Sequence, residues 1–277
     1  MLIAGPRWLP VFAVVLCGLL VIIGLRSAAP PTELLPDIDP AAPKELTVEP
    51  DESGGFQLSF DATFDNVGDG PLHIEGHRPD ASERRMVADQ VVTRLDGSTR
   101  LNPDVGELRF VESEDHRHWH FIRFMRYELV RPTDDELVAP DRKTGFCLGD
   151  RYDADASVRL PGEPLAPGVF DVPPDPDWCA RDDPDRSHLT MGLSVGYGDK
   201  YHAFLDGQSI DVTDVPEGRY HLVHRVNADV RESDYSNNAA SVLLELRWPD
   251  SSDDPPTVEM LASCADSARC PSEELTQ

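Results

Sequence analysis

The stretch Phe56-Gln-Leu-Ser-Phe-Asp-Ala-Thr-Phe64 decides the fold class, because apolar and polar residues alternate along it without a break. Successive side chains of a β-strand point to opposite faces, so this alternation predicts a strand with one buried and one polar face. The polar stretch Asn66-Val-Gly-Asp-Gly70 follows at once and has the composition of a turn. A half-buried strand and a turn therefore open the globular part of the chain.

Segments of similar character recur downstream, with little sustained helical periodicity between them. We expect strands within 108–111 and 119–130, and a late pair at 220–227 and 240–248. Residues 161–188 are dense in Pro, Asp and Gly and predict a long irregular loop. The expected fold is mainly β, a β-sandwich-like domain with long irregular loops, preceded by one N-terminal hydrophobic segment.

The N-terminal segment predicts the cellular compartment of the chain. Residues 8–25 carry no charge and lie between Arg7 and Arg26, which predicts a signal peptide or membrane anchor over 1–26. A clear small-residue cleavage site is absent from the sequence after this run, which favours an uncleaved anchor. Either reading places the rest of the chain outside the cytoplasm. Residues 27–44, rich in Pro and Ala, are expected to form an extended linker. The main domain spans 45–249, and 250–277 form an acidic C-terminal tail.

The formal charge of −26 excludes general binding to nucleic acid, which needs a basic surface. A strongly acidic surface instead concentrates cations, including amines and metal ions. The alternative reading is that the acidic residues only keep an exported protein soluble. We find no recognisable calcium-loop motif among the acidic segments.

The cysteines predict disulfide bonds. One cysteine, Cys17, lies inside the N-terminal hydrophobic run, which leaves an even number in the exported part. Four exported cysteines indicate two disulfides, and three pairings are possible. We expect Cys147 to pair with Cys179 across the long loop, and Cys264 to pair with Cys270 in the tail.

The strongest local signal is Asp115-His-Arg-His-Trp-His-Phe121. Histidines at i, i+2 and i+4 share one face only on an extended strand, where the α-carbons of His116 and His120 lie ~13 Å apart. Imidazoles favour copper, zinc, nickel or iron over calcium. Three protein ligands leave coordination positions open, which is typical of a catalytic metal site. The competing readings are a surface histidine cluster or histidine rings that face the core, in either case without a metal.

Several later segments, taken in order with the triplet, resemble the catalytic domain of the lysyl oxidase family. They are Arg142-Lys-Thr-Gly-Phe-Cys-Leu-Gly-Asp150, Tyr201-His-Ala-Phe-Leu-Asp-Gly-Gln-Ser-Ile-Asp-Val-Thr-Asp214, Pro216-Glu-Gly-Arg-Tyr220 and Glu232-Ser-Asp-Tyr-Ser-Asn-Asn238. The resemblance runs from about residue 56 to 248. Around the triplet and the Tyr201 segment this chain lacks cysteines that animal members carry, which implies a reduced disulfide framework.

The resemblance implies specific roles. His116, His118 and His120 match the copper(II) ligands of the family, and Lys143 and Tyr201 match the two residues that become lysine tyrosylquinone. The implied activity is O2-dependent oxidative deamination of primary amines to aldehydes, with release of ammonia and hydrogen peroxide. Peptidyl lysine, polyamines and alkylamines are all possible substrates.

The general base of that reaction must lie within hydrogen-bond reach of the substrate carbon, and Asp206 and Asp211 are the candidates nearest to Tyr201 in sequence. Two other classes of function stay open at this point. One is a non-catalytic metal-binding β-sandwich displayed on the cell surface. The other is a different metalloenzyme, although non-haem iron sites usually combine two histidines with a carboxylate.

Overall fold

The structure is a computed structural model that describes residues 31–113, 116–141, 143, 145–154, 170, 177–226, 228–250 and 254–271. The chain divides into two units, Met1–Pro30 and Pro31–Gln277, and the first lies outside the described residues. The predicted hydrophobic segment at 1–26 therefore lies outside them too, as do 161–169 and 171–176 of the predicted loop and the last six residues of the tail. In the described part of the chain, no helix is long and apolar enough to span a membrane.

Among the described residues of the second unit, regular structure consists of β-strands and one short 3-10 turn, η2 (Trp178–Ala180), so the predicted mainly β class is confirmed. Three sheets with antiparallel strands account for it. The first sheet has the order β12-β5-β6-β7-β8, and β1 pairs with β6 at its side. Its strands are β1 (Glu33–Leu34), β5 (Leu72–His77), β6 (Arg85–Arg94), β7 (Thr99–Glu112), β8 (Arg117–Phe121) and β12 (His188–Leu193).

The second sheet has the order β10-β9-β15-β16-β17. Its strands are β9 (Met125–Val130), β10 (Leu137–Pro140), β15 (Gly218–Val226), β16 (Ala239–Arg247) and β17 (Thr257–Cys264). The predicted late pair corresponds to β15 and β16, which are neighbours in this sheet. The expected single strand over 119–130 is wrong, because a turn at residues 122–124, with Arg123 at φ 58°, separates β8 from β9.

The third sheet has the order β11-β13-β4-β14, and β2 and β3 also pair with β4. Its strands are β2 (Ile38–Pro40), β3 (Lys44–Pro50), β4 (Phe56–Asn66), β11 (Tyr152–Asp153), β13 (Tyr197–Tyr201) and β14 (Ser209–Asp211). Strand β4 contains the alternating stretch, and every second residue from Phe56 to Asn66 is buried. The turn predicted after it is present at residues 68–70.

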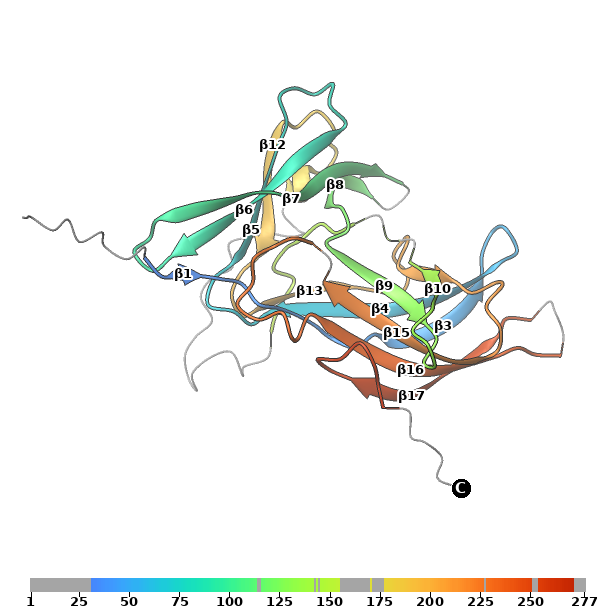
Figure 1. The fold of residues 1–277 in the computed structure, drawn as a ribbon. Helices are drawn as coiled ribbons and strands as arrows, with labels where there is room; N and C mark the ends of the chain where they lie inside the picture. Colours follow the sequence, from blue (N-terminus) through green and yellow to red (C-terminus); the bar gives the residue numbers. More distant parts are fainter. Residues whose placement is uncertain are drawn as a thin grey trace, which may run out of the picture. The chain divides into compact units, whose positions relative to one another are not determined.

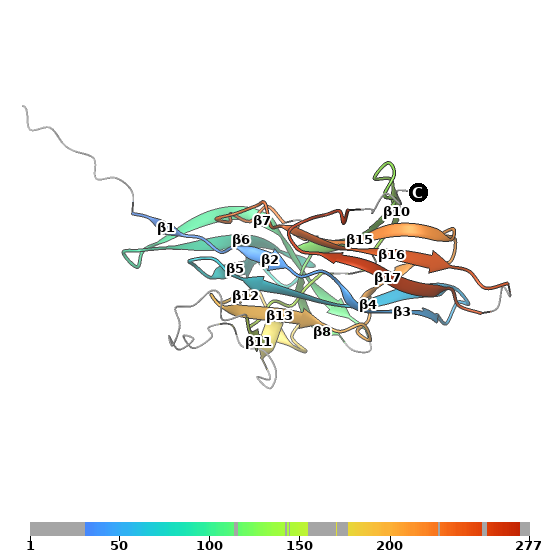
Figure 2. The same cartoon turned by 90° about the horizontal axis from the view of Figure 1, so that it is seen from below.

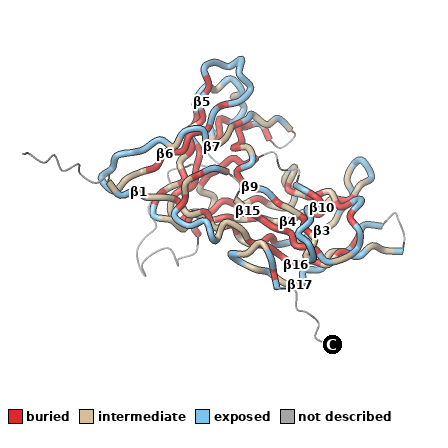
Figure 3. Tube along the Cα trace, in the orientation of Figure 1, coloured by how far each residue is buried: buried red, intermediate tan, exposed pale blue. Residues whose placement is uncertain are grey.

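The second and third sheets pack face to face (Figures 1 and 2), with β2 against β15 and β16 and β14 against β9. The rings of Phe60 on β4 and Tyr127 on β9 meet edge to face with centroids 4.7 Å apart. Figure 3 shows buried residues along these facing strands and exposed residues at the hairpin ends. This is the predicted sandwich. Of the strands that carry the site, β13 belongs to it, whereas β8 lies in the first sheet.

Strands at both ends of the described chain join the sheets, although they lie outside the main domain predicted at 45–249. In the expected linker, β1 pairs with β6 and β2 pairs with β4. In the expected tail, β17 pairs with β16. Short strands at a sheet edge gain most of their stability from backbone pairing with a partner, so composition alone does not reveal them. Both predicted disulfides, Cys147–Cys179 and Cys264–Cys270, are present in the structure.

Candidate metal centre and lysine–tyrosine pair

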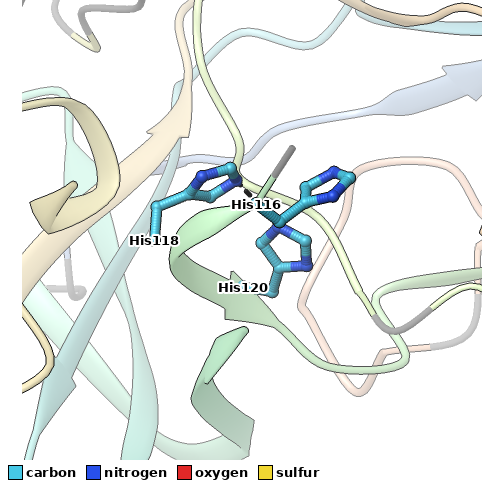
Figure 4. Close-up of side chains that lie close together, drawn as sticks. All are labelled: His116, His118 and His120. Carbon is cyan, nitrogen blue, oxygen red and sulfur yellow. Dashed lines mark hydrogen bonds between the residues drawn. The ribbon is translucent and has the colours of Figure 1, made fainter. Parts of the chain in front are cut away.

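The three histidines converge at strand β8. His118 and His120 lie on β8 and His116 immediately precedes it, so the spacing of two places all three rings on one side of the strand, as Figure 4 shows. Ring centroids are 5.4 Å apart for His116 and His118, 5.2 Å for His116 and His120, and 4.7 Å for His118 and His120. One ring nitrogen of each residue lies within 4.8 Å of those of the other two.

The histidine face is covered rather than open to solvent, because His116, His118 and His120 are only 6%, 4% and 2% exposed. The backbone at Gly145 lies across β8, where Phe146 and Phe121 exchange backbone hydrogen bonds. Gly145 has φ +123°, and a Cβ there would lie 2.7 Å from the carbonyl oxygen of Phe121. A glycine is therefore required for this segment to approach the histidine strand so closely.

Burial keeps the imidazoles of His118 and His120 neutral. It lowers the pKa of His118 to about 3, with the charge of His116 as a further cause, and lowers the pKa of His120 well below its usual range. The Nε2 atoms of His118 and His120 lie 2.8 Å apart, and their Nδ1 atoms have no hydrogen-bond partner among the described residues. His116 Nδ1 lies 3.3 Å from the hydroxyl of Ser113. Neutral, converging, incompletely bonded imidazoles are suited to a transition-metal ion such as copper(II) or zinc(II).

Lys143, on the segment that covers β8, contacts the ring of Tyr201. Its Nζ lies 4.4 Å from the centroid of the Tyr201 ring and 5.4 Å from that of Phe146. Although part of the residue is exposed, Nζ itself is buried and has no hydrogen-bond partner among the described residues. Burial lowers the pKa of Lys143 to about 8. The lysine therefore presents an unbonded amine with enhanced nucleophilicity to an aromatic ring.

Tyr201 ends strand β13 and is 4% exposed, with its backbone paired to Ala62 of β4. Its hydroxyl donates to the carbonyl oxygen of Cys147 at 2.9 Å and to Oδ2 of Asp199 at 3.1 Å. The ring of Phe146 meets it edge to face, with centroids 4.9 Å apart. Burial raises the pKa of Tyr201 well above its usual value, and the carboxylate of Asp199 adds to the shift.

The disulfide connects the histidine cluster to the tyrosine. Cys147 provides the carbonyl that accepts from Tyr201, while its partner Cys179 follows Trp178. The ring of Trp178 packs against His118 with centroids 4.4 Å apart. The positive charges of Lys143 and Arg151 contribute to the lowered pKa of His118, so these groups share one electrostatic environment.

Asp199 and Arg151 form a buried ion pair beside Tyr201 that the sequence analysis missed. Asp199 is fully buried, and the Arg151 guanidinium lies 5.4 Å from the centroid of the Tyr201 ring. A signal for Asp199 existed, because residues two apart on a strand share a face and Asp199 precedes Tyr201 by two. Arg151 follows the Cys147 segment and gives no comparable signal in the sequence.

The two aspartates considered as a general base lie in different environments. Asp206 is exposed on the loop after Tyr201, and its charge acts on Lys143. Asp211 ends β14, and its Oδ1 accepts from the backbone N–H and the hydroxyl of Thr213. Asp206 therefore acts electrostatically on the lysine–tyrosine pair.

Comparison with known proteins adds independent information. The lysyl oxidase family model matches residues 184–250, a range that includes Tyr201. Lysyl oxidase homolog 2 of Gallus gallus is 32% identical over 158 residues, which is 56% of this chain and 17% of that protein. Lysyl oxidase homolog 2B of Danio rerio is 29% identical over 163 residues (58% and 18%), and lysyl oxidase homolog 2 of Homo sapiens is 28% identical over 163 residues (58% and 18%). The matches thus span less than a fifth of the length of these relatives.

Proposed function

This chain belongs to the lysyl oxidase family, and on that premise we propose that it is a copper-dependent amine oxidase. The proposed reaction is the O2-dependent oxidative deamination of primary amines to aldehydes, with release of ammonia and hydrogen peroxide. His116, His118 and His120 would hold copper(II), and Lys143 and Tyr201 would form lysine tyrosylquinone.

The donor set fits copper. The buried imidazoles of His118 and His120, whose pKa values are lowered, stay neutral at physiological pH, so protons do not compete with the metal for their ring nitrogens. Imidazole is a suitable ligand for copper, and three protein ligands leave positions for exchangeable ones. Among the described residues, the Nδ1 atoms of His118 and His120 have no hydrogen-bond partner, which also supports a ligand at the cluster.

The contact between Lys143 and Tyr201 is the observation that carries the proposal. The buried amine faces the tyrosine ring at 4.4 Å and has no other bonding partner among the described residues. A buried lysine without a counter-ion is costly for a folded protein, and such residues are found where the amine reacts. The pKa of about 8 leaves a usable fraction of free amine at neutral pH.

The bound group supplies the chemistry that side chains lack: copper(II) with O2 supplies the oxidation of the Tyr201 ring, and the finished quinone supplies an electrophilic carbonyl for the substrate amine. The protein's part is positioning. The carbonyl of Cys147 and the carboxylate of Asp199 hold the Tyr201 hydroxyl, while Phe146 packs edge to face on the ring. These contacts keep the ring next to Lys143 and exclude water from it.

The charge of the chain supports a cationic substrate. With a formal charge of −26, the protein attracts ammonium groups at low ionic strength, and peptidyl lysine, polyamines and alkylamines all carry one. The two disulfides support an oxidising, extracytoplasmic compartment. We place the domain there, secreted or held at the membrane by the segment 1–26.

The experiment is peptide mapping by mass spectrometry of the full chain, purified after incubation with copper(II) in air. We expect the peptides that contain Lys143 and Tyr201 to be covalently joined, with the mass of an oxidised tyrosine ring. Lys143→Arg should abolish the joined peptide and the release of peroxide from an added alkylamine. Lys200→Arg is the matched control, because Lys200 adjoins Tyr201 in sequence but is ion-paired to Asp61.

Two separate, unmodified peptides from copper-loaded protein would overturn the enzyme assignment. They would favour the alternative of a non-catalytic metal-binding β-sandwich module. A joined peptide in Lys143→Arg would instead show that another lysine reacts.

A further inference from the structure

The carboxylate of Asp199 is saturated with donors despite full burial. Its Oδ2 accepts from the Tyr201 hydroxyl at 3.1 Å and from the backbone N–H of Gly149 at 3.3 Å. Its Oδ1 accepts from the backbone N–H of Lys200 at 2.8 Å and forms an ion pair with Nε of Arg151. One oxygen is thus held against the phenol and the other against a guanidinium.

Arg151 lies between the two aromatic side chains of the site. Its guanidinium carbon is 5.4 Å from the centroid of the Tyr201 ring and 5.8 Å from that of Trp178. Its Nη2 donates to the carbonyl of Cys147 at 3.2 Å, the same carbonyl that accepts from Tyr201. The guanidinium is therefore adjacent both to the carboxylate and to the tyrosine.

This arrangement lets a proton move without creating a new buried charge. Transfer of the phenolic proton to Asp199 shifts the negative charge from the carboxylate to the phenolate, and Arg151 is the counter-ion of both. In a low-dielectric interior, loss of the same proton without a nearby acceptor and counter-ion is costly. The other acceptor at the hydroxyl is the peptide carbonyl of Cys147, which is not a base at neutral pH.

We propose that Asp199 accepts the phenolic proton of Tyr201 while the cofactor forms, and that Arg151 compensates the charge of the resulting phenolate. In this step the Tyr201 O–H bond breaks, its electron pair stays on the phenolic oxygen, and a new O–H bond forms on Oδ2 of Asp199. The inference rests on the proposed function, because the phenolate is the electron-rich ring that copper(II) and O2 would oxidise. Arg151 is a positioning residue, since it acts through Asp199 and the ring.

The surroundings of Asp199 define the pH range of the step. The titratable groups that face it are Arg151 and Tyr152 after Cys147, Lys143 before it, Tyr127 on β9 and Tyr201 on its own strand. Burial raises the pKa of Asp199 to about 6, against the opposing charge of Arg151. The carboxylate is therefore ionised and able to accept at neutral pH, and it is protonated at lower pH.

The first test compares the rate of Lys143–Tyr201 crosslinking in wild type, Asp199→Asn and Asp65→Asn at pH 7, by peptide mapping of the full chain after copper(II) and air are added. Asp65 is the matched control, because its Oδ1 accepts from the hydroxyl of Tyr152 at 2.5 Å. We expect Asp199→Asn to slow crosslinking by at least ~100-fold, within the range of a lost general base, while Asp65→Asn matches wild type. Copper content and thermal melting of each variant are measured alongside.

The second test needs no variant. In wild type, the rate at which Tyr201 is oxidised, followed as loss of the unmodified Tyr201 peptide, should be level above pH ~7 and fall about tenfold per pH unit below about 6, as Asp199 becomes protonated. This rate is measured in place of crosslinking, because addition of Lys143 follows the protonation of its own amine, with a pKa of about 8. Copper occupancy is measured at each pH, so that metal loss is not mistaken for this effect. A rate that is flat from pH 5 to 7 at full occupancy overturns the proposal even if Asp199→Asn fails to fold.

The third test is made without copper, on protein with 13C-labelled tyrosine. The negative charge of Asp199 raises the pKa of Tyr201, so Asp199→Asn should shift the NMR titration of Tyr201 to lower pH. Asp65→Asn should not move it. An unchanged titration overturns the coupling between Asp199 and Tyr201.

The outcomes separate the two proposals. A wild type that crosslinks and an Asp199→Asn variant that crosslinks equally fast overturn the role of Asp199 and leave the amine oxidase intact. A copper-loaded wild type that never crosslinks overturns both.

Discussion

The inner and outer faces of strand β13 carry similar chemistry in opposite environments. On the inner face, Tyr201 and the fully buried Asp199 meet Lys143, whose amine has no partner among the described residues. On the outer face, Lys200 is 39% exposed and lies 3.4 Å from the carboxylate of Asp61. His202 follows Tyr201 and lies 3.2 Å from the same carboxylate.

The difference shows what burial does to a lysine. A lysine paired at the surface contributes little to stability. A lysine that is desolvated without a carboxylate in contact becomes a weaker base and a better nucleophile, as the pKa of about 8 for Lys143 indicates. The following predictions test this contrast between the two faces.

The largest effect is expected from Tyr201→Phe on the inner face. Without the phenolic oxygen no quinone can form, so release of peroxide from a primary amine should fall to background. His202→Phe introduces the same side chain on the outer face and should keep activity within ~3-fold of wild type, since substitutions outside a site usually have small effects. If both variants are equally inactive, the two faces do not differ in function.

Removal of the Cys147–Cys179 disulfide should give the largest loss of stability. The bond joins residues 32 apart and Cys264–Cys270 joins residues 6 apart, so loop-closure entropy predicts losses of about 4 and about 2 kcal/mol. Urea unfolding of the two paired Cys→Ser variants measures both. The Cys147 carbonyl holds the Tyr201 hydroxyl, so only the first variant should also slow crosslinking. Equal crosslinking rates in the two variants would show that the Cys147–Cys179 disulfide does not help to position Tyr201.

Lys143→Met should stabilise the copper-free protein by about 3 kcal/mol at pH 7, because it removes a buried ammonium. The folded pKa of about 8 lies below the ordinary value of 10.5, so the unfolded chain binds more protons between these values. Wild-type stability therefore rises with pH over this window, and the advantage of the variant disappears above pH ~10.5. Lys200→Met should change stability by less than ~0.5 kcal/mol at either pH. If Lys143→Met is less stable than wild type at pH 7, the buried ammonium of Lys143 does not destabilise the fold, and the contrast with the surface lysine Lys200 fails.

Asp61→Asn, on the outer face, should have the smallest effect, a loss of about 1 kcal/mol at pH 7. Burial alone raises the pKa of Asp61, but the N–H of Ala203 and the charges of His202 and Lys200 lower it overall. The stabilisation by the ionised Asp61 carboxylate is thus fully present above pH 3.8, the ordinary pKa of an aspartate. It is lost as the pH falls through the lowered pKa of Asp61 in the folded protein. Urea unfolding at pH 7 and pH 3 measures it, and 1 M salt should weaken it. A loss that persists undiminished at low pH would point to packing instead.

Much of the framework could be predicted from local patterns. The alternation in 56–64 became β4, the late pair became β15 and β16, and both disulfide pairings were correct. The break between β8 and β9 was missed because it depends on a positive φ at Arg123, for which an arginine gives no sequence signal. Strands β1, β2 and β17 were missed because their stability comes from a partner strand.

The sequence by itself determined the β class and the convergence of the three histidines, because a period of two along one strand is a local property of the backbone. Only the tertiary structure decided that Lys143 meets Tyr201, 58 residues away, and that Asp199 and Arg151 stand beside them. The physical reason is that burial is not local. The cost of desolvating an amine, and the counter-ion that offsets it, depend on which distant segments pack together.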